Sequence, residues 1–128
     1  MTEPSVLIDT NICIYVLGDA DSFAARRLAT CSEGSVAASI ITYAELLRGL
    51  HVGSPKDAHK LAKLFSRVPV LPFDEAAAQA YARLPFRRGS FDRLIAAHAL
   101  SRGLTLVTNN ERHFADVAGL TVENWARP

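Results

Sequence analysis

The sequence predicts an α/β fold in which a mainly parallel sheet is covered by helices on both faces. Short β-rich runs alternate with segments of helical period, and short connections join them, as is typical of βαβ units. Such units place the strands parallel and their crossovers right-handed. The strand segments are rich in Val, Leu and Ile with little polar alternation, as expected for strands buried on both faces. We interpret residues 1–128 as one domain, because the chain contains no linker, repeat or low-complexity tract.

The expected elements follow in order along the chain. The expected strands are aliphatic or β-branched runs, at residues 6–9, 35–38, 68–71, 105–108 and 120–123. The expected helices have an apolar period of 3.6 residues and start or stop signals such as Ser22, Pro85 and Gly103. They cover residues 10–18, 22–31, 40–50, 55–65, 74–84 and 91–102.

The composition is that of an ordinary globular protein, with 49% hydrophobic and 21% charged residues, and this excludes a disordered chain. Cys13 and Cys31 have no Cys or His at metal-ligand spacing, so we interpret them as core thiols in a reducing compartment. The N-terminus does not resemble a signal peptide, and no apolar run is long enough to cross a membrane. We therefore expect a cytoplasmic protein.

The net charge does not indicate a polyanionic partner, but a local cluster of arginines does. The net charge of +1 leaves no overall electrostatic attraction for nucleic acid. Arginines do cluster before and within the helix expected at 91–102, and a further one lies in the helix expected at 40–50. The candidates for phosphate contacts are Arg87, Arg88, Arg93 and Arg48, with Arg83 beside them. A solvated loop is the alternative interpretation of the cluster.

Asp9 lies between an apolar strand and a helix. It can cap the helix, but Asn11 is also available for that role. In open parallel sheets the ligand site lies outside the carboxyl ends of the strands, where we expect both Asp9 and the segment from Thr108 to Asn110. We therefore predict that Asp9 is a functional carboxylate.

Glu45 and Asp92 each have a structural and a functional interpretation. Thr42 and Glu45 match the capping-box pattern, but a cap at Ser39 would place Glu45 inside a mostly apolar helix. Asp92 follows Ser90 in the first turn of a helix, where the helix dipole favours an acid. The residues alone leave both interpretations open.

Three further titratable side chains have simpler explanations. Asp74 opens a helix, so we assign it to capping. His98 and His113 have no Cys or His partner nearby in the sequence, so we expect them to be packing or surface residues.

A cluster of Asp9, Glu45 and Asp92 would need its mutual repulsion relieved by protonation or by a cation. A hard divalent ion is the usual partner of an all-oxygen cluster. We expect Asp9 and Asp92 to be the primary ligands, while Glu45 ligates through water or orients the attacking water.

Five motifs together resemble the PIN-domain ribonucleases of the VapC toxin type. They are LIDTNI (7–12), SIITYAELLRG (39–49), FDRLIAAHA (91–99), LVTNNERHF (106–114) and GLTVENW (119–125). The motifs span nearly the whole chain in the family's order. By this resemblance Asp9, Glu45 and Asp92 match the family's first three acids, and Asn11 and Thr108 match its supporting polar positions.

The resemblance implies a three-layer α/β/α sandwich with a Mg²⁺ or Mn²⁺ site and endonucleolytic cleavage of structured RNA. A tRNA or an rRNA loop is the leading substrate class, so the cleavage would inhibit translation. The resemblance also implies a homodimer and inhibition by a cognate VapB-type antitoxin. Exposed apolar residues expected on the first helices, Ile14, Tyr15 and Leu50, are consistent with self-association and with a groove for an antitoxin helix.

One position departs from the family pattern, because Asn110 stands where many members have a fourth acid. Glu111 and Asp116 follow nearby, so the sequence leaves open which of the three fills the fourth position. We expect Asn110 to hold a metal-bound water by a hydrogen bond. With one charge missing, we expect a single tightly held ion rather than two.

Two other functions compete with this hypothesis. A PIN fold can serve as a protein-binding module without catalysis, since function belongs to sites rather than folds. An Asp-based phosphotransfer enzyme also has an Asp after its first strand, but it needs a second Asp two residues later and a downstream lysine. This chain has Asn11 at that position, and no lysine follows Lys63.

Overall fold

The computed structural model describes residues 3–49, 55–87 and 90–128, and within them five parallel strands form one sheet in the order β3-β2-β1-β4-β5. The strands are β1 (Val6–Ile8), β2 (Val36–Ser39), β3 (Val70–Leu71), β4 (Thr105–Thr108) and β5 (Val122–Asn124). The helices are α1 (Thr10–Gly18), α2 (Phe23–Ala29), α3 (Ile40–Gly49), α4 (Pro55–Arg67), α5 (Glu75–Arg83) and α6 (Phe91–Ser101). A short 3₁₀ helix, η1 (Glu111–Phe114), follows β4.

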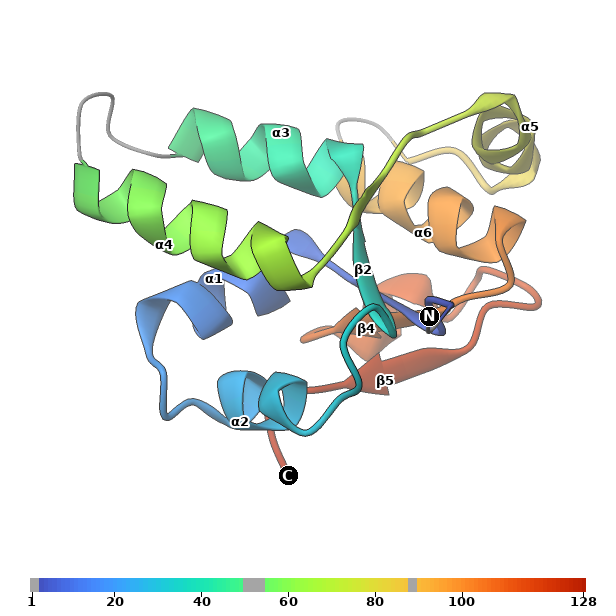
Figure 1. The fold of residues 1–128 in the computed structure, drawn as a ribbon. Helices are drawn as coiled ribbons and strands as arrows, with labels where there is room; N and C mark the ends of the chain where they lie inside the picture. The colour runs from blue at the N-terminus through green and yellow to red at the C-terminus, as the bar shows by residue number, and fades with distance from the viewer. Residues whose placement is uncertain (1–2, 50–54, 88–89) are drawn as a thin grey trace.

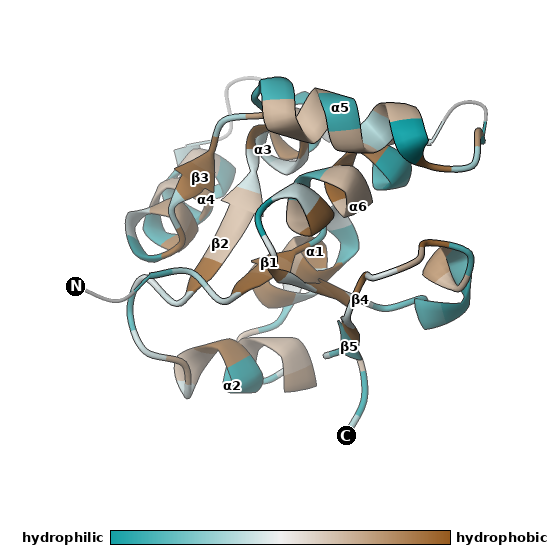
Figure 2. Cartoon of the chain, turned by 90° about the vertical axis from the view of Figure 1, so that its right-hand side faces the viewer, coloured by the Kyte–Doolittle hydropathy of each residue, from teal (hydrophilic) through white to brown (hydrophobic). Residues whose placement is uncertain are grey.

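Helices cover both faces of the sheet, so the predicted three-layer α/β/α sandwich is confirmed. In Figure 1, α1, α2 and α4 lie to the left of the sheet, and α5 and α6 lie to its right. Successive side chains of a strand point to opposite faces. Ile8 accordingly packs into the core beneath α1, α2 and α4, whereas Leu7 packs against α6. Figure 2 shows hydrophobic strands inside and a mixed surface on the outermost helix, α5.

The register brings three strand ends together at one edge. Ile8 lies between Ala38 of β2 and Val107 of β4, and the Asp9 N–H donates to the Val107 carbonyl at 2.9 Å. The residues that end or follow β1, β2 and β4 are therefore neighbours. They include Asp9, Ser39 and Thr108.

The element boundaries differ from the prediction where capping or helix length decides them. β1 ends at Ile8 rather than Asp9, because Asp9 is the N-cap of α1. β3 consists only of Val70–Leu71, because α4 continues to Arg67 and Val68 still donates to a helical carbonyl. The helix η1 was not predicted at all.

The two thiols lie in different environments. Cys13 is fully buried in α1, and burial raises the pKa of its thiol. Cys31 lies beyond the end of α2 and is only partly buried, so its prediction as a helical core residue was wrong.

Within the described residues, no helix has the length and apolar character needed to cross a membrane.

Candidate active site

Asp9 is a buried carboxylate at the carboxyl end of the central strand. Its side chain is the N-cap of α1, because Oδ1 accepts a hydrogen bond from the Ile12 N–H at 3.0 Å, and the residue is only 3% exposed. The pKa of Asp9 is raised from 3.8 to about 6, chiefly by burial and also by the nearby Asp92 and Glu45 carboxylates. Hydrogen bonds from the Thr108 side chain and the Ile12 backbone oppose this rise. The capping interpretation of Asp9 is therefore confirmed, and the same side chain stays the predicted functional carboxylate.

Glu45 lies inside α3 and faces the start of α1. The helix begins at Ile40, so Thr42 is an interior residue and the capping-box interpretation is wrong. The Thr10 hydroxyl donates to Glu45 Oε1 at 2.6 Å and also lies 3.3 Å from the Thr42 hydroxyl. Thr10 therefore holds the carboxylate of Glu45 beside the residue that follows β1.

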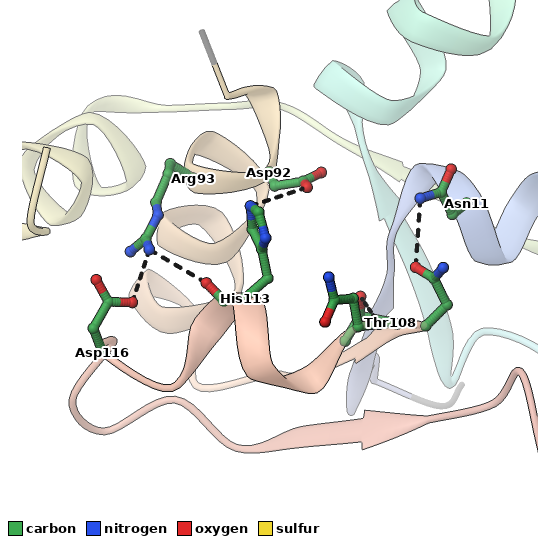
Figure 3. Close-up of polar contacts among 8 residues, drawn as sticks. Asn11, Asp92, Arg93, Thr108, His113 and Asp116 are labelled. Carbon is green, nitrogen blue, oxygen red and sulfur yellow. Dashed lines mark hydrogen bonds and ion pairs between the residues drawn. The ribbon is translucent and has the colours of Figure 1, made fainter. Parts of the chain in front are cut away.

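Asp92 lies in the first turn of α6 with its side chain partly exposed. Its Oδ2 atom is 3.9 Å from Nε2 of His113, which comes from η1 (Figure 3). His113 is therefore more than a surface residue. The sequence contained no signal for this contact, because 21 positions of chain separate a helix start from an unpredicted 3₁₀ helix.

Polar side chains after β4 form a short hydrogen-bonded series beside Asp9. The Thr108 hydroxyl accepts from the Asn110 N–H at 3.2 Å. Asn11 donates to the Asn109 side chain at 3.4 Å, and Asn109 donates to the Tyr15 hydroxyl at 3.0 Å. The predicted supporting residues Asn11 and Thr108 thus lie at the carboxyl edge of the sheet, and Asn110 lies exposed at the same edge.

The predicted arginine patch is only partly available to a ligand. Arg93 is 1% exposed and forms an ion pair with Asp116 at 2.7 Å, so its prediction as an RNA-binding residue was wrong. Arg87 also pairs with Asp116, at 3.5 Å, but half of its side chain remains exposed. Arg48 is exposed in the last turn of α3. Arg88 and Leu50 lie outside the described residues.

The two alternative acids for the fourth position have other partners. Asp116 bonds to Arg93, which lowers the pKa of that carboxyl. Glu111 accepts hydrogen bonds from Asn124 and Arg127, which lower its pKa. Of the three candidates, Asn110 alone is bonded directly to Thr108, whose side chain lowers the pKa of Asp9.

A buried Ser39–His98 pair lies under the site. Nδ1 of His98 is 2.8 Å from the Ser39 hydroxyl, which also accepts from the Ile41 N–H at 3.1 Å. Burial lowers the pKa of His98, and Phe73 packs edge-on against its ring. His98 is therefore a packing residue, as predicted, and Asp74 caps α5 as predicted by accepting from Ala77.

The carboxylate oxygens of the site suit a hard divalent ion whose coordination is completed by water molecules. The carboxylates of Asp9, Glu45 and Asp92 supply only oxygen atoms, and their proximity contributes to the raised pKa of Asp9. Across residues 3–49, 55–87 and 90–128, no group of three or more His, Cys, Asp or Glu side chains is arranged to hold a metal ion. Mg²⁺ is commonly held by one or two carboxylates and several waters, so the residues present fit it.

Comparison with known protein families and sequences gives a consistent result. The profile of the PIN domain matches residues 6–120. The chain is 36% identical to the tRNA(fMet)-specific endonuclease VapC of Shigella flexneri, with 94% of this chain and 97% of that protein covered. It is 32% identical to ribonuclease VapC2 of Rickettsia felis, with 93% and 96% covered.

Solved structures have the same fold. VapBC2 from Rickettsia felis, crystallised with a DNA fragment from its promoter, contains a chain with a TM-score of 0.81 and 28% identity, covering 94% of this chain and 98% of that one. DNA-bound VapBC from Salmonella typhimurium gives a TM-score of 0.80 at 31% identity, with 95% and 98% covered.

Proposed function

This chain belongs to the PIN-domain family and, within it, to the VapC ribonucleases, and on that basis we propose that it is the toxin of a toxin-antitoxin pair. Its proposed reaction is the endonucleolytic hydrolysis of structured RNA with Mg²⁺ or Mn²⁺, which inhibits translation. The proposed catalytic residues are Asp9, Glu45, Asp92 and Asn110, and the proposed supporting residues are Asn11 and Thr108.

The observation that carries the proposal is the environment of Asp9. A carboxylate that is 3% exposed, with a pKa raised to about 6 and two further acids close enough to contribute, is costly to keep in a fold. Such strongly perturbed groups at the carboxyl edge of a parallel sheet are typical of active sites. A protein-binding module would gain nothing from this cost.

Each proposed residue has a role that follows from its contacts. Asp9 is held by the hydrogen bond from the Ile12 N–H to its Oδ1 atom, which fixes the carboxylate at the carboxyl end of β1. Glu45, held by the Thr10 hydroxyl, orients the attacking water. Asn110 contributes a neutral amide that can hold a water by a hydrogen bond.

The metal ion would be held by Asp9 and Asp92, with Glu45 acting directly or through water. When bound, a divalent ion lowers the pKa of water and stabilises negative charge on the phosphate oxygens. It would also remove the repulsion that raises the pKa of Asp9.

Substrate binding would rest on the exposed arginines near the site, Arg48 and Arg87. The identity of the RNA is proposed from the names of the relatives. Two of the relatives carry the name tRNA(fMet)-specific endonuclease, so initiator tRNA is the first substrate to test, ahead of an rRNA loop.

The proposed partners are a cognate VapB-type antitoxin and a second copy of the chain. An apolar groove between α1, α2 and α4 has basic side chains on its rim and fits an amphipathic segment that carries acids. Its lining includes Val16, Leu17, Leu28, Leu64, Lys60 and Lys63. Ile14 and Tyr15 are exposed as predicted, at 48% and 39%, and provide apolar surface for association.

The decisive experiment is RNA cleavage by purified protein freed of any partner. Initiator tRNA, an elongator tRNA and an rRNA fragment are incubated with Mg²⁺, Mn²⁺ or EDTA. We expect discrete cleavage with either metal, none with EDTA, and none with Asp9→Asn at matched concentration. Cleavage in EDTA would refute the metal dependence, and cleavage by folded Asp9→Asn would refute the proposed site.

A further inference from the structure

We propose that Arg93 is a positioning residue, which with Asp116 fixes residues 110–116 against α6 so that His113 and Asn110 face the active-site acids. This inference rests on the proposed function, because it takes Asp9 and Asp92 as active-site residues. Arg93 itself does not touch RNA in this proposal. It acts through the segment that it holds.

The contacts of Arg93 all lead to the segment that follows β4. A single guanidinium nitrogen, Nη2, donates to Asp116 Oδ1 at 2.7 Å and to the His113 carbonyl at 3.3 Å (Figure 3). Arg93 belongs to α6 and directly follows Asp92 in sequence. The helix that carries Asp92 is therefore bonded to the segment that carries His113.

These bonds continue to the centre of the site. The His113 N–H donates to the Asn110 carbonyl at 3.2 Å, and the Asn110 N–H donates to the Thr108 hydroxyl at 3.2 Å. The N–H of Asp9 donates to the carbonyl of Val107, the residue before Thr108, at 2.9 Å. Backbone and side-chain hydrogen bonds thus connect Arg93 to strand β4, which is bonded directly to Asp9. A displacement of residues 110–116 would move Asn110 and the His113 ring relative to both aspartates.

Stability alone does not explain the choice of arginine at this position. Arg93 is almost completely buried, yet its Nε and Nη1 atoms have no hydrogen-bond partner in the described part of the chain. Buried ion pairs can often be replaced by apolar residues without loss of stability. If an apolar residue replaced Arg93, Asp116 would keep its ion pair with Arg87 and its contact with solvent. The two bonds made by Nη2 are therefore what the arginine contributes at this position.

The test compares three variants of the full chain. Arg93→Met keeps the volume and removes both bonds. Arg93→Lys keeps the positive charge and a single donor nitrogen, which matches the one nitrogen, Nη2, that makes both contacts. Arg102→Met is the matched control, because Arg102 is an exposed arginine at the end of the same helix. Each protein is measured for kcat and KM on the cleaved RNA, for Tm, and for backbone hydrogen exchange.

For Arg93→Met we expect kcat to fall about 10- to 100-fold, as small misplacements of catalytic groups can cause. KM and Tm should change little, and amides of residues 110–116 should exchange faster. Arg93→Lys should recover most of kcat, and Arg102→Met should match the wild type.

Three results would overturn the inference. They are an unchanged kcat, a loss of activity that only follows a loss of folded protein, and a rise in KM alone, which would make Arg93 an RNA contact. Hydrogen exchange distinguishes a failure of this inference from a failure of the proposed function. If the wild type cleaves no RNA but Arg93→Met still loosens residues 110–116, the function fails and the positioning contact stands. If exchange in that segment is unchanged, the inference fails whatever the activity.

Discussion

Thr10 and Glu45 are joined by a 2.6 Å hydrogen bond although 35 positions separate them. The hydroxyl that follows Asp9 thereby determines where the carboxylate of α3 lies. Since a hydroxyl is the donor, the contact depends on one hydrogen atom that a methyl group cannot supply.

Thr10→Val should therefore lower activity without unfolding the protein. Valine has the same shape, so the packing of α1 is kept, and loss of one partly buried hydrogen bond costs about 1 kcal/mol. We expect kcat to fall about tenfold or more because Glu45 loses its orientation, while Thr10→Ser keeps wild-type activity. Single-turnover cleavage and urea unfolding measure the two effects. Equal kcat for Thr10→Val and the wild type would exclude a role for this bond.

Asp9→Asn should stabilise the metal-free protein at alkaline pH. Asp9 has a higher pKa in the folded state, about 6 against 3.8, so its favourable contribution is complete below pH 3.8 and is lost as the pH rises through 6. The corresponding difference is about 3 kcal/mol at pH 8. Asn caps a helix as well as Asp does, so the variant avoids this loss.

Urea unfolding of both proteins in EDTA, at pH 4 and pH 8, measures the effect. The variant should gain stability over the wild type at pH 8 and gain little at pH 4. A gain of the same size at both values would mean that the ionisation of Asp9 is not its cause. Addition of Mg²⁺ should then stabilise the wild type and leave Asp9→Asn unchanged.

Buried His98 should make the protein less stable in mild acid. Burial, with Arg102 nearby, lowers the pKa of His98 below 6.5, so its stabilising contribution is complete above pH 6.5 and is lost as the pH falls below that value. The His98→Asn variant keeps a polar atom toward Ser39 but does not titrate.

We expect the wild type to lose more stability than His98→Asn between pH 7 and pH 5. Asp9 acts in the opposite direction, but it is present in both proteins, so the difference isolates His98. Titration of the imidazole C–H resonances by NMR gives the pKa directly. A His98 pKa at or above 6.5 would contradict the prediction.

Asn110→Asp should make the fold more dependent on metal. The added carboxylate repels the neighbouring acids when no ion is bound and strengthens attraction to a dication. The variant should therefore melt at a lower temperature than the wild type in EDTA. Its rise in Tm with millimolar Mg²⁺ or Mn²⁺ should be larger. A rise no larger than that of the wild type would place Asn110 outside the ion's surroundings.

Much of the fold could be predicted from the sequence because apolar runs and caps are local signals. Ser22 and Asp74 cap their helices as predicted, and the strands β1, β2 and β4 lie where the apolar runs are. β3 was predicted too long because Val68 is apolar whether it ends a helix or begins a strand. Periodicity alone does not separate these cases.

The site could be predicted only in part, because residue type does not reveal burial or partners. Asp9 was recognisable from its place after a strand. Arg93 was predicted to contact RNA, and Asp116 was one of three candidates for the fourth position of the site, each considered as a single charged residue. Their pairing with each other depends on how the segment of η1 packs against α6. No local sequence pattern predicts that packing.

The central position of β1 also determines when the proposed site can form during synthesis of the chain. The residues of β1 are synthesised well before those of their pairing strand β4, because Val6 pairs with Thr105. Such distant pairing is slow to form and cannot begin before the later strand exists. Chains that terminate before β4 carry Asp9 and Glu45 without Thr108 or the edge that gathers the acids. A fragment made by interrupted translation therefore lacks the sheet edge on which the proposed site depends.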